Sequence, residues 1–207
     1  MKLSDTMLDS MLAFDNITTA NFYGKRNAFG GNVPLENSSS SDADIEISIH
    51  YSQTESSESG NRYVLWAYAT LLKQPVILTN DRLHLTNDAV FNSHYREYGS
   101  VLQVGYCKKC SEYITNLYDV SDEKRRDGDL LLEYERRAPS IHFEVSKAKC
   151  PTCLKSIENV SFTSFVQYGF ITKEPINVNL EYVRDNILKD KYTTGIIIHN
   201  NEKSTDE

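Results

Sequence analysis

The sequence predicts an α+β fold, a small mixed domain with a four-cysteine zinc-ribbon lobe built from two β-hairpins. Residues 44–51, "DIEISIHY", alternate apolar and polar side chains, as a strand with one buried face does. Residues 62–73 and 177–190 instead space their apolar residues three or four apart, which is typical of amphipathic helices. The four cysteines form two C-x-x-C pairs, and each pair lies between β-rich runs.

The first half of the chain is expected to contain two helices and two strands. Residues 1–16 repeat Leu and Met every four positions, which predicts a short amphipathic helix. Residues 62–73, "RYVLWAYATLLK", predict the main core helix of this half, which must end before Pro75 because proline cannot continue a helix. Residues 75–88 are strand-like, with a turn expected at residues 80–81.

In the second half, four β-rich runs surround the cysteine pairs and predict the two hairpins. These runs cover residues 101–106, 112–120, 141–149 and 158–165. The charged stretch 121–139 is expected to be an insert between the hairpins, and residues 177–190 and 193–200 a C-terminal helix and strand. The expected organisation is an N-terminal α+β region with Ser-rich loops at 1–97, the zinc-ribbon lobe at 98–170, the returning helix and strand at 171–199, and a disordered tail at 200–207.

The composition favours a soluble protein that works through protein contacts. The 207 residues are 40% hydrophobic and carry a net charge of −7, which argues against strong attraction to nucleic acid or anionic lipid. The N-terminus lacks the positive flank and apolar run of a signal peptide, and the longest apolar run, residues 63–69, is far shorter than the ~20 residues that span a bilayer. We therefore expect a cytoplasmic protein with protein partners and no membrane contact.

The cysteines predict one structural zinc ion. Cys107 and Cys110 form one pair, Cys150 and Cys153 form the other, and no cysteine is left over. Two residues between cysteines let both thiolates of a tight turn face one point, and two such turns complete a tetrahedron. The 39 residues between the pairs exceed the usual ~15–20, which the charged insert explains. Disulfides and free structural thiols remain the alternatives, although disulfides need an oxidising compartment.

A second motif overlaps the second cysteine pair and raises the question of an enzyme. His142 and Glu144 form H-x-E, which zinc deaminases combine with a P-C-x-x-C pair, but only five residues separate Glu144 from Cys150 and "IHFEV" alternates like a strand. Four thiolates would also leave no open metal position for water. The sequence contains no phosphate-binding glycine loop, no nucleophile elbow and no H-E-x-x-H motif. We therefore expect no enzymatic activity, and we expect His142 to be a half-exposed strand residue, with a hydrogen bond to a cysteine turn as the alternative.

The alternative function is nucleic-acid binding, or modulation of transcription, by the zinc ribbon. Its contact surface would be a cluster of four arginines, Arg125, Arg126, Arg136 and Arg137. Within residues 107–155, however, ten Lys and Arg are balanced by nine Asp and Glu, so the lobe lacks the one-sided positive field that phosphate binding uses. A solvated face is the simpler interpretation of these arginines.

The segment "HYREYGSVLQVGYCKKC", with the later "CPTCLKSIENVSFTSF", resembles T-even-type tailed-phage proteins that assist assembly of the baseplate hub. In that family an Arg and a Tyr-Gly precede a strand that leads into a C-x-x-C turn, and these positions are Arg96, Tyr98, Gly99, Cys107 and Cys110 here. The likeness covers about a third of the chain. It implies a non-enzymatic late phage protein that brings hub components together, located in the host cytoplasm, or in the virion if it is retained there.

Overall fold

The computed structural model describes residues 17–25, 31–35, 42–57, 60–73, 79–87, 95–121, 123–135, 138–145, 149–185 and 189–199. These residues form thirteen strands and no helix, so none of them belongs to a helix that could cross a membrane. The fold is therefore all-β, and the α+β prediction is wrong. The helix predicted for residues 1–16 and the tail predicted for residues 200–207 lie outside the described part of the chain.

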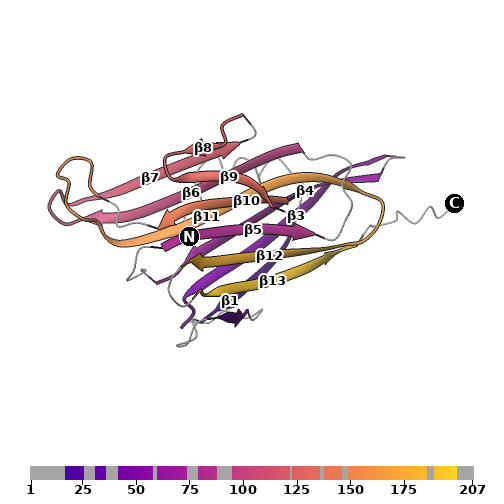
Figure 1. The fold of residues 1–207 in the computed structure, drawn as a ribbon, viewed down its shortest axis with the longest axis horizontal. Coiled ribbons are helices and arrows are strands. Elements are labelled where there is room, and N and C mark those ends of the chain that lie inside the picture. Colours follow the sequence, from indigo (N-terminus) through magenta and orange to yellow (C-terminus); the bar gives the residue numbers. More distant parts are fainter. Residues whose placement is uncertain are drawn as a thin grey trace.

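The strands form two sheets that pack face to face as a β-sandwich (Figure 1). Sheet A has six strands in the order β1 (Thr18–Gly24), β3 (Ile45–Ser57), β4 (Gly60–Leu71), β11 (Glu158–Thr172), β6 (Tyr95–Cys107) and β7 (Glu112–Ser121). Sheet B has seven in the order β2 (Asn32–Pro34), β13 (Lys191–Ile198), β12 (Ile176–Asp185), β5 (Thr79–Asn87), β10 (Ala138–Val145), β9 (Leu130–Glu135) and β8 (Arg126–Asp127). All neighbours are antiparallel except β13 and β2, which are parallel.

Several of the predicted strands are confirmed, and one predicted turn is wrong. The strand predicted at residues 44–51 is β3, and the C-terminal strand predicted at residues 193–200 is β13. Strand β5 runs straight through the turn predicted at residues 80–81. The reason is that Asp81, which looks like a turn residue, is buried in a polar network with Arg184.

Strand β4 replaces the helix predicted for residues 62–73. It lies in the middle of sheet A, between β3 and β11, and both of its faces are buried. Leu65 and Ala67 face the main core, whereas Trp66 and Tyr68 belong to a second apolar cluster on the opposite face of sheet A. A strand buried on both faces reads as a continuous apolar run, so apolar residues also occur at helical spacing within it.

Strand β12 replaces the helix predicted for residues 177–190. Val178, Leu180 and Tyr182 are all buried in the main core, and the residues between them are exposed or half-exposed. Buried side chains in this strand therefore recur at every second residue. Val183, whose spacing from Leu180 favoured a helix, lies on the opposite, half-buried face of the strand.

Of the two predicted hairpins, only one is present. β6 and β7 pair without a break, as predicted. The runs at residues 141–149 and 158–165 instead enter different sheets, since β10 pairs with β5 and β9 whereas β11 pairs with β4 and β6. The stretch predicted as an insert, residues 121–139, supplies β8 and β9 to sheet B. β9, β10 and β11 each have an apolar side that the core between the sheets buries and that an isolated hairpin could not.

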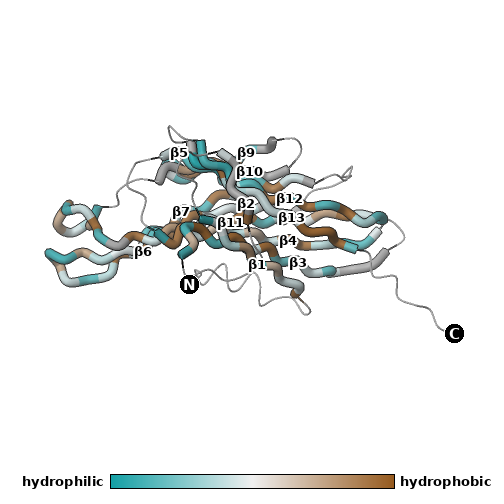
Figure 2. Tube along the Cα trace, turned by 90° about the horizontal axis from the view of Figure 1, so that it is seen from below, coloured by the Kyte–Doolittle hydropathy of each residue, from teal (hydrophilic) through white to brown (hydrophobic). Residues whose placement is uncertain are grey.

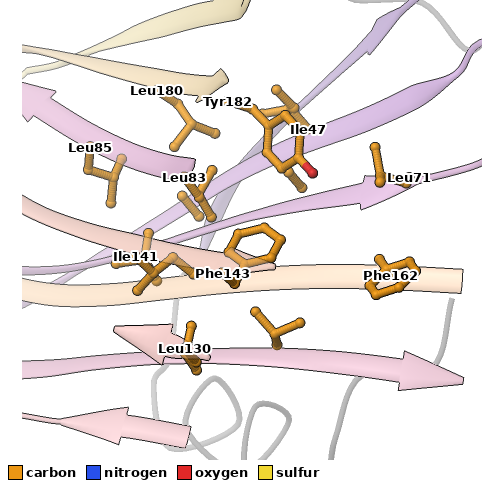
Figure 3. Packing of buried hydrophobic residues seen from close by; sticks show 14 of the residues in the cluster. Ile47, Leu71, Leu83, Leu85, Leu130, Ile141, Phe143, Phe162, Leu180 and Tyr182 are labelled. Carbon is orange, nitrogen blue, oxygen red and sulfur yellow. The ribbon is translucent and has the colours of Figure 1, made fainter. Parts of the chain in front are cut away.

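The main core fills the space between the two sheets. Figure 3 shows Ile47 of sheet A beside Tyr182 of sheet B, among the other labelled side chains of the core. Gly99 of β6 lies where the sheets approach closely, because a Cβ atom there would be 2.4 Å from Ile141 Cγ2. This contact places β6, the strand that leads to the first cysteine pair, against sheet B.

Candidate metal centre

Two tight turns at one end of the sandwich carry the four cysteines. The first turn joins β6 to β7, and Cys107 pairs with Glu112 at its base. The second lies between β10 and β11, where an isolated β-bridge joins Lys149 to Ser156. Figure 2 shows the two loops together, projecting beyond the rest of the sandwich at the end where β6 leaves it. The two turns, far apart in sequence, therefore face each other in space.

Both turns place the residue after their second cysteine in the left-handed backbone region. Ser111 has φ 56° and Leu154 has φ 58°. In the second turn this conformation accompanies a hydrogen bond of 2.8 Å from the Leu154 N–H to the Cys150 carbonyl. Neither residue is glycine, which adopts left-handed φ values at lower energetic cost. The two cysteine turns thus share a left-handed residue at the same position, although their sequences differ.

The four sulfur atoms lie close together across the two turns. All four Sγ atoms are within 4.8 Å of one another, with Cys107 Sγ 3.5 Å from Cys153 Sγ and Cys110 Sγ 3.7 Å from Cys150 Sγ. Sulfurs that bind one zinc ion at ~2.3 Å on tetrahedral corners are ~3.8 Å apart, whereas a disulfide holds its sulfurs at ~2.05 Å. The structure thus brings together all four sequence-predicted cysteines, as free thiols in a group that could hold a metal ion.

The sulfur cluster is half enclosed by protein. Cys107 and Cys150 are buried within the hydrophobic core cluster, while Cys110 and Cys153 are half-buried and pack against it. Lys108 lies exposed on the rim of the first turn, where its Nζ pairs with Glu158 Oε2. The site is therefore shielded on its inner side, and its outer rim carries an ion pair.

One of the four thiols, that of Cys153, has a pKa close to neutral pH. The backbone N–H of Lys155 donates to the Cys153 sulfur and lowers the pKa of that thiol to about 7. The pKa of Cys110 is raised instead, first because its thiol hydrogen-bonds to the Cys153 sulfur. Binding of a divalent cation would overcome the raised pKa of Cys110, because a thiol that coordinates a metal is deprotonated outright. Metal binding at this site would therefore release protons.

An acidic residue beside the cluster, Glu112, is not singled out by the sequence pattern. Its Oε1 accepts hydrogen bonds from Cys150 Sγ at 3.8 Å and from Thr152 Oγ1 at 3.5 Å. A Cys150 thiolate has no proton to donate to Glu112. The Glu112 carboxylate therefore repels the deprotonated cysteines that would bind a metal ion. The only sequence signal for this neighbour is an acid two residues after a C-x-x-C pair.

The structure does not bring His142 into the cysteine group. His142 Nε2 lies 3.3 Å from Glu133 Oε2 and 3.2 Å from Ser140 Oγ, and the side chain is half-exposed, as predicted. Glu144 follows on the same strand, where its backbone pairs with Asn80 of β5. Among the described residues, the group with metal-holding geometry consists of the four cysteines.

The structure places two of the four candidate nucleic-acid-binding arginines. Arg125 and Arg126 are exposed at β8, on the edge of sheet B. Arg126 also lines an open cavity of about 600 Å³ whose wall includes the acidic Asp129. Arg136 and Arg137 lie outside the described residues. The two placed arginines are therefore interspersed with acidic side chains.

No family model and no curated protein sequence matches this chain. Similar solved structures include the C-terminal domain of the Streptococcus pyogenes antigen I/II-family protein AspA, with 10% identity and a TM-score of 0.43 over 81% of this chain and 57% of that one. The C-terminal domain of the Streptococcus agalactiae AgI/II polypeptide BspA matches with 6% identity and a TM-score of 0.42 over 89% of this chain and 50% of that one. The Clostridium perfringens NetB toxin in its membrane inserted form matches with 8% identity and a TM-score of 0.30 over 89% and 94% of the two chains. The chain thus spans about half the length of the streptococcal chains, and likeness at these values carries no argument about function.

Proposed function

We propose that the four cysteines bind one zinc ion in a structural site. The observation that carries this proposal is the pair of sulfur distances across the turns, 3.5 Å and 3.7 Å, which match the ~3.8 Å separation of a zinc tetrathiolate. Four thiolates around one point suit zinc or iron, whereas magnesium and calcium prefer oxygen ligands. Zinc is the ion proposed here, and iron is the alternative that metal analysis would detect.

Zinc at this site would stabilise the fold rather than perform chemistry. A tetrahedral ion with four protein ligands has no open position for water or substrate. Structural zinc contributes an apparent ~10–16 kcal/mol, which is comparable to the ~5–15 kcal/mol total stability of a domain. We infer that the two cysteine turns lose their structure without the metal, because the ion is the link that ties their half-buried ends together.

We infer that the protein is a non-enzymatic assembly factor that works through protein contacts, and that its setting is assembly of the baseplate hub of a T-even-type tailed phage. The net charge of −7 suits protein partners better than nucleic acid. Two of the residues that carry the resemblance make structural contacts from β6. Tyr98 Oη donates to Asp119 of β7, and Gly99 allows close contact with Ile141 of β10. Both contacts fix the strand that ends at Cys107.

Reconstitution with the purified hub proteins of a T-even-type phage tests this function. Native mass spectrometry of each mixture would compare the metal-loaded wild type with the Cys150→Ser variant and with Leu72→Ser, which alters an exposed residue outside the site. We expect wild type and Leu72→Ser to form a complex with at least one hub protein, and Cys150→Ser to lose it. If no hub protein binds the metal-loaded chain, the hub assignment is wrong, while the zinc proposal is unaffected.

Nucleic-acid binding is the competing function, and the exposed pair Arg125 and Arg126 is the observation in its favour. A complex with duplex DNA or with RNA that weakens steeply with salt, and that the double substitution Arg125→Ala/Arg126→Ala abolishes, would support it. We expect no such complex, because Asp127 and Asp129 lie within four residues of both arginines and reduce the positive field.

A further inference from the structure

The outer edge of β7 has backbone hydrogen-bonding groups that no neighbouring strand uses. β7 is the last strand of sheet A, so only alternate residues can bond to β6. The residues that point outward are identified by two hydrogen bonds, from the Asp119 N–H to Asp127 Oδ2 at 2.9 Å and from the Ser121 N–H to the Lys124 carbonyl at 2.8 Å. The odd-numbered residues of β7 therefore direct their N–H and C=O groups away from β6.

Only the C-terminal half of this edge is covered. Asp127 and Lys124 occupy the positions beside residues 119 and 121, and Figure 1 shows β8 alongside that part of β7. The same alternation directs the backbone groups of Tyr113, Thr115 and Leu117 outward, and in the described part of the chain nothing bonds to them. This half of β7 lies beside the projecting cysteine turns (Figure 2).

The open half of the edge also lacks the features that normally prevent strands from pairing. Residues 113–117, "YITNL", contain no charge, no proline and no glycine, and their pairing with β6 has no bulge. Tyr113 is 78% exposed and Leu117 is 38% exposed, and their side chains lie on the same face of sheet A. Exposed, flat and apolar edges of this kind pair with another strand or aggregate.

We propose that this chain forms a two-fold symmetric dimer in which the β7 edges of two copies pair as antiparallel strands, with the symmetry axis at Thr115. Antiparallel pairing of outward residues requires odd positions to face odd positions, and a centre at Thr115 is the register that uses Tyr113, Thr115 and Leu117 together. Each of the three residue pairs then exchanges two backbone hydrogen bonds.

The side chains of this strand complement themselves in that register, which is why a second copy is the occupant. Tyr113 of each copy lies opposite Leu117 of the other, and aromatic–aliphatic cross-strand pairs stabilise sheets. Thr115 faces its own equivalent, and no like charges meet within residues 113–117. The pairing joins the two sheets A into one continuous sheet and brings Tyr113 and Leu117 of each copy into cross-strand contact.

Analytical ultracentrifugation of the full chain, from low-micromolar to near-millimolar concentration, tests the dimer. Thr115→Pro removes an outward N–H but no bond to β6, and Leu117→Lys places a charge on the paired edge. Ile197→Lys is the matched control, since Ile197 is a 56% exposed strand residue of sheet B. We expect wild type and Ile197→Lys to dimerise, and each β7 variant to raise the dissociation constant by at least about tenfold.

Amide hydrogen exchange of the same samples reads the register directly. The amides of Tyr113, Thr115 and Leu117 should become protected as concentration rises, whereas those of Ile114 and Asn116, which point to β6, should be protected throughout. If Thr115→Pro does not fold, the dissociation constant of Leu117→Lys tests the dimer by itself. A wild type that stays monomeric over the whole range, or a dimer that survives both β7 variants, would overturn the proposal. Either result leaves the metal site and the proposed function untouched.

Discussion

Protonation of His50 should destabilise the fold in mildly acidic solution. His50 lies on the outer face of sheet A, where it is 6% exposed and stacks on Tyr68 with ring centroids 5.1 Å apart. Its Nδ1 lies 2.8 Å from Thr19 Oγ1, and its Nε2 has no hydrogen-bond partner among the described residues. Burial without an acidic partner disfavours the imidazolium form and lowers the pKa of His50 from 6.5 to about 4.

The size of the effect follows from the difference between the two pKa values. Because the pKa is lower in the folded state, the folded protein binds fewer protons, so this stability is complete above the unfolded-state pKa of 6.5 and is lost as the pH falls toward 4. The free energy of unfolding should therefore be about 2 kcal/mol lower at pH ~5 than at pH ~8 on account of His50 alone.

Urea unfolding at a series of pH values, on wild type and His50→Gln, measures this contribution. Acid also protonates the cysteine site, so only the difference between the two proteins isolates His50, and the variant should show the shallower pH dependence. His199→Gln, at an exposed position, is the control and should follow the wild type. Parallel curves for wild type and His50→Gln between the two pKa values would refute the assignment of a buried neutral histidine.

Three further substitutions test particular contacts. Leu154→Gly should stabilise the metal-loaded protein by about 1 kcal/mol and raise its melting temperature, because glycine relieves the left-handed φ of 58°. Leu72→Gly, at a residue with ordinary φ, should lower the melting temperature. Gly99→Ala should cost about 1–3 kcal/mol in chemical unfolding, since the new Cβ would lie 2.4 Å from Ile141 Cγ2, and Ile141→Ala in the same chain should remove part of that penalty. Glu112→Gln should tighten metal binding several-fold in competition with a chelator, because it removes a negative charge beside Cys150, and an unchanged affinity would show that this carboxylate does not act on the site.

Sequence patterns predicted β3, whose apolar and polar residues alternate, and mistook β4 and β12 for helices. Residues 44–51 alternate clearly, because the core face of β3 is fully buried and the other face carries polar residues. β4 has apolar residues on both faces, so its twelve positions matched a helix as well as a strand. The decisive information, that β3 and β11 flank it on either side, is long-range and cannot be read from local spacing.

The candidate site was more predictable than the fold around it. The spacing of a C-x-x-C pair constrains a local turn, so Cys107 and Cys110 could be assigned to one point without knowledge of the sheets. The arrangement of the strands on either side of the second turn could not be predicted in this way, because β10 and β11 enter different sheets. Glu112 and the open half of β7 depend on three-dimensional neighbours, and neither has a distinctive local pattern.

Metal analysis of the natively purified protein tests the central claim most directly. Mass spectrometry of metal content should be combined with titration of thiols before and after denaturation. One zinc ion per chain is expected, with four thiols that react only after unfolding or chelation, and with the zinc lost in Cys107→Ser and in Cys150→Ser. A chain that carries no metal, with its four thiols freely reactive or joined in disulfides, would contradict the zinc site and the assembly role inferred from it.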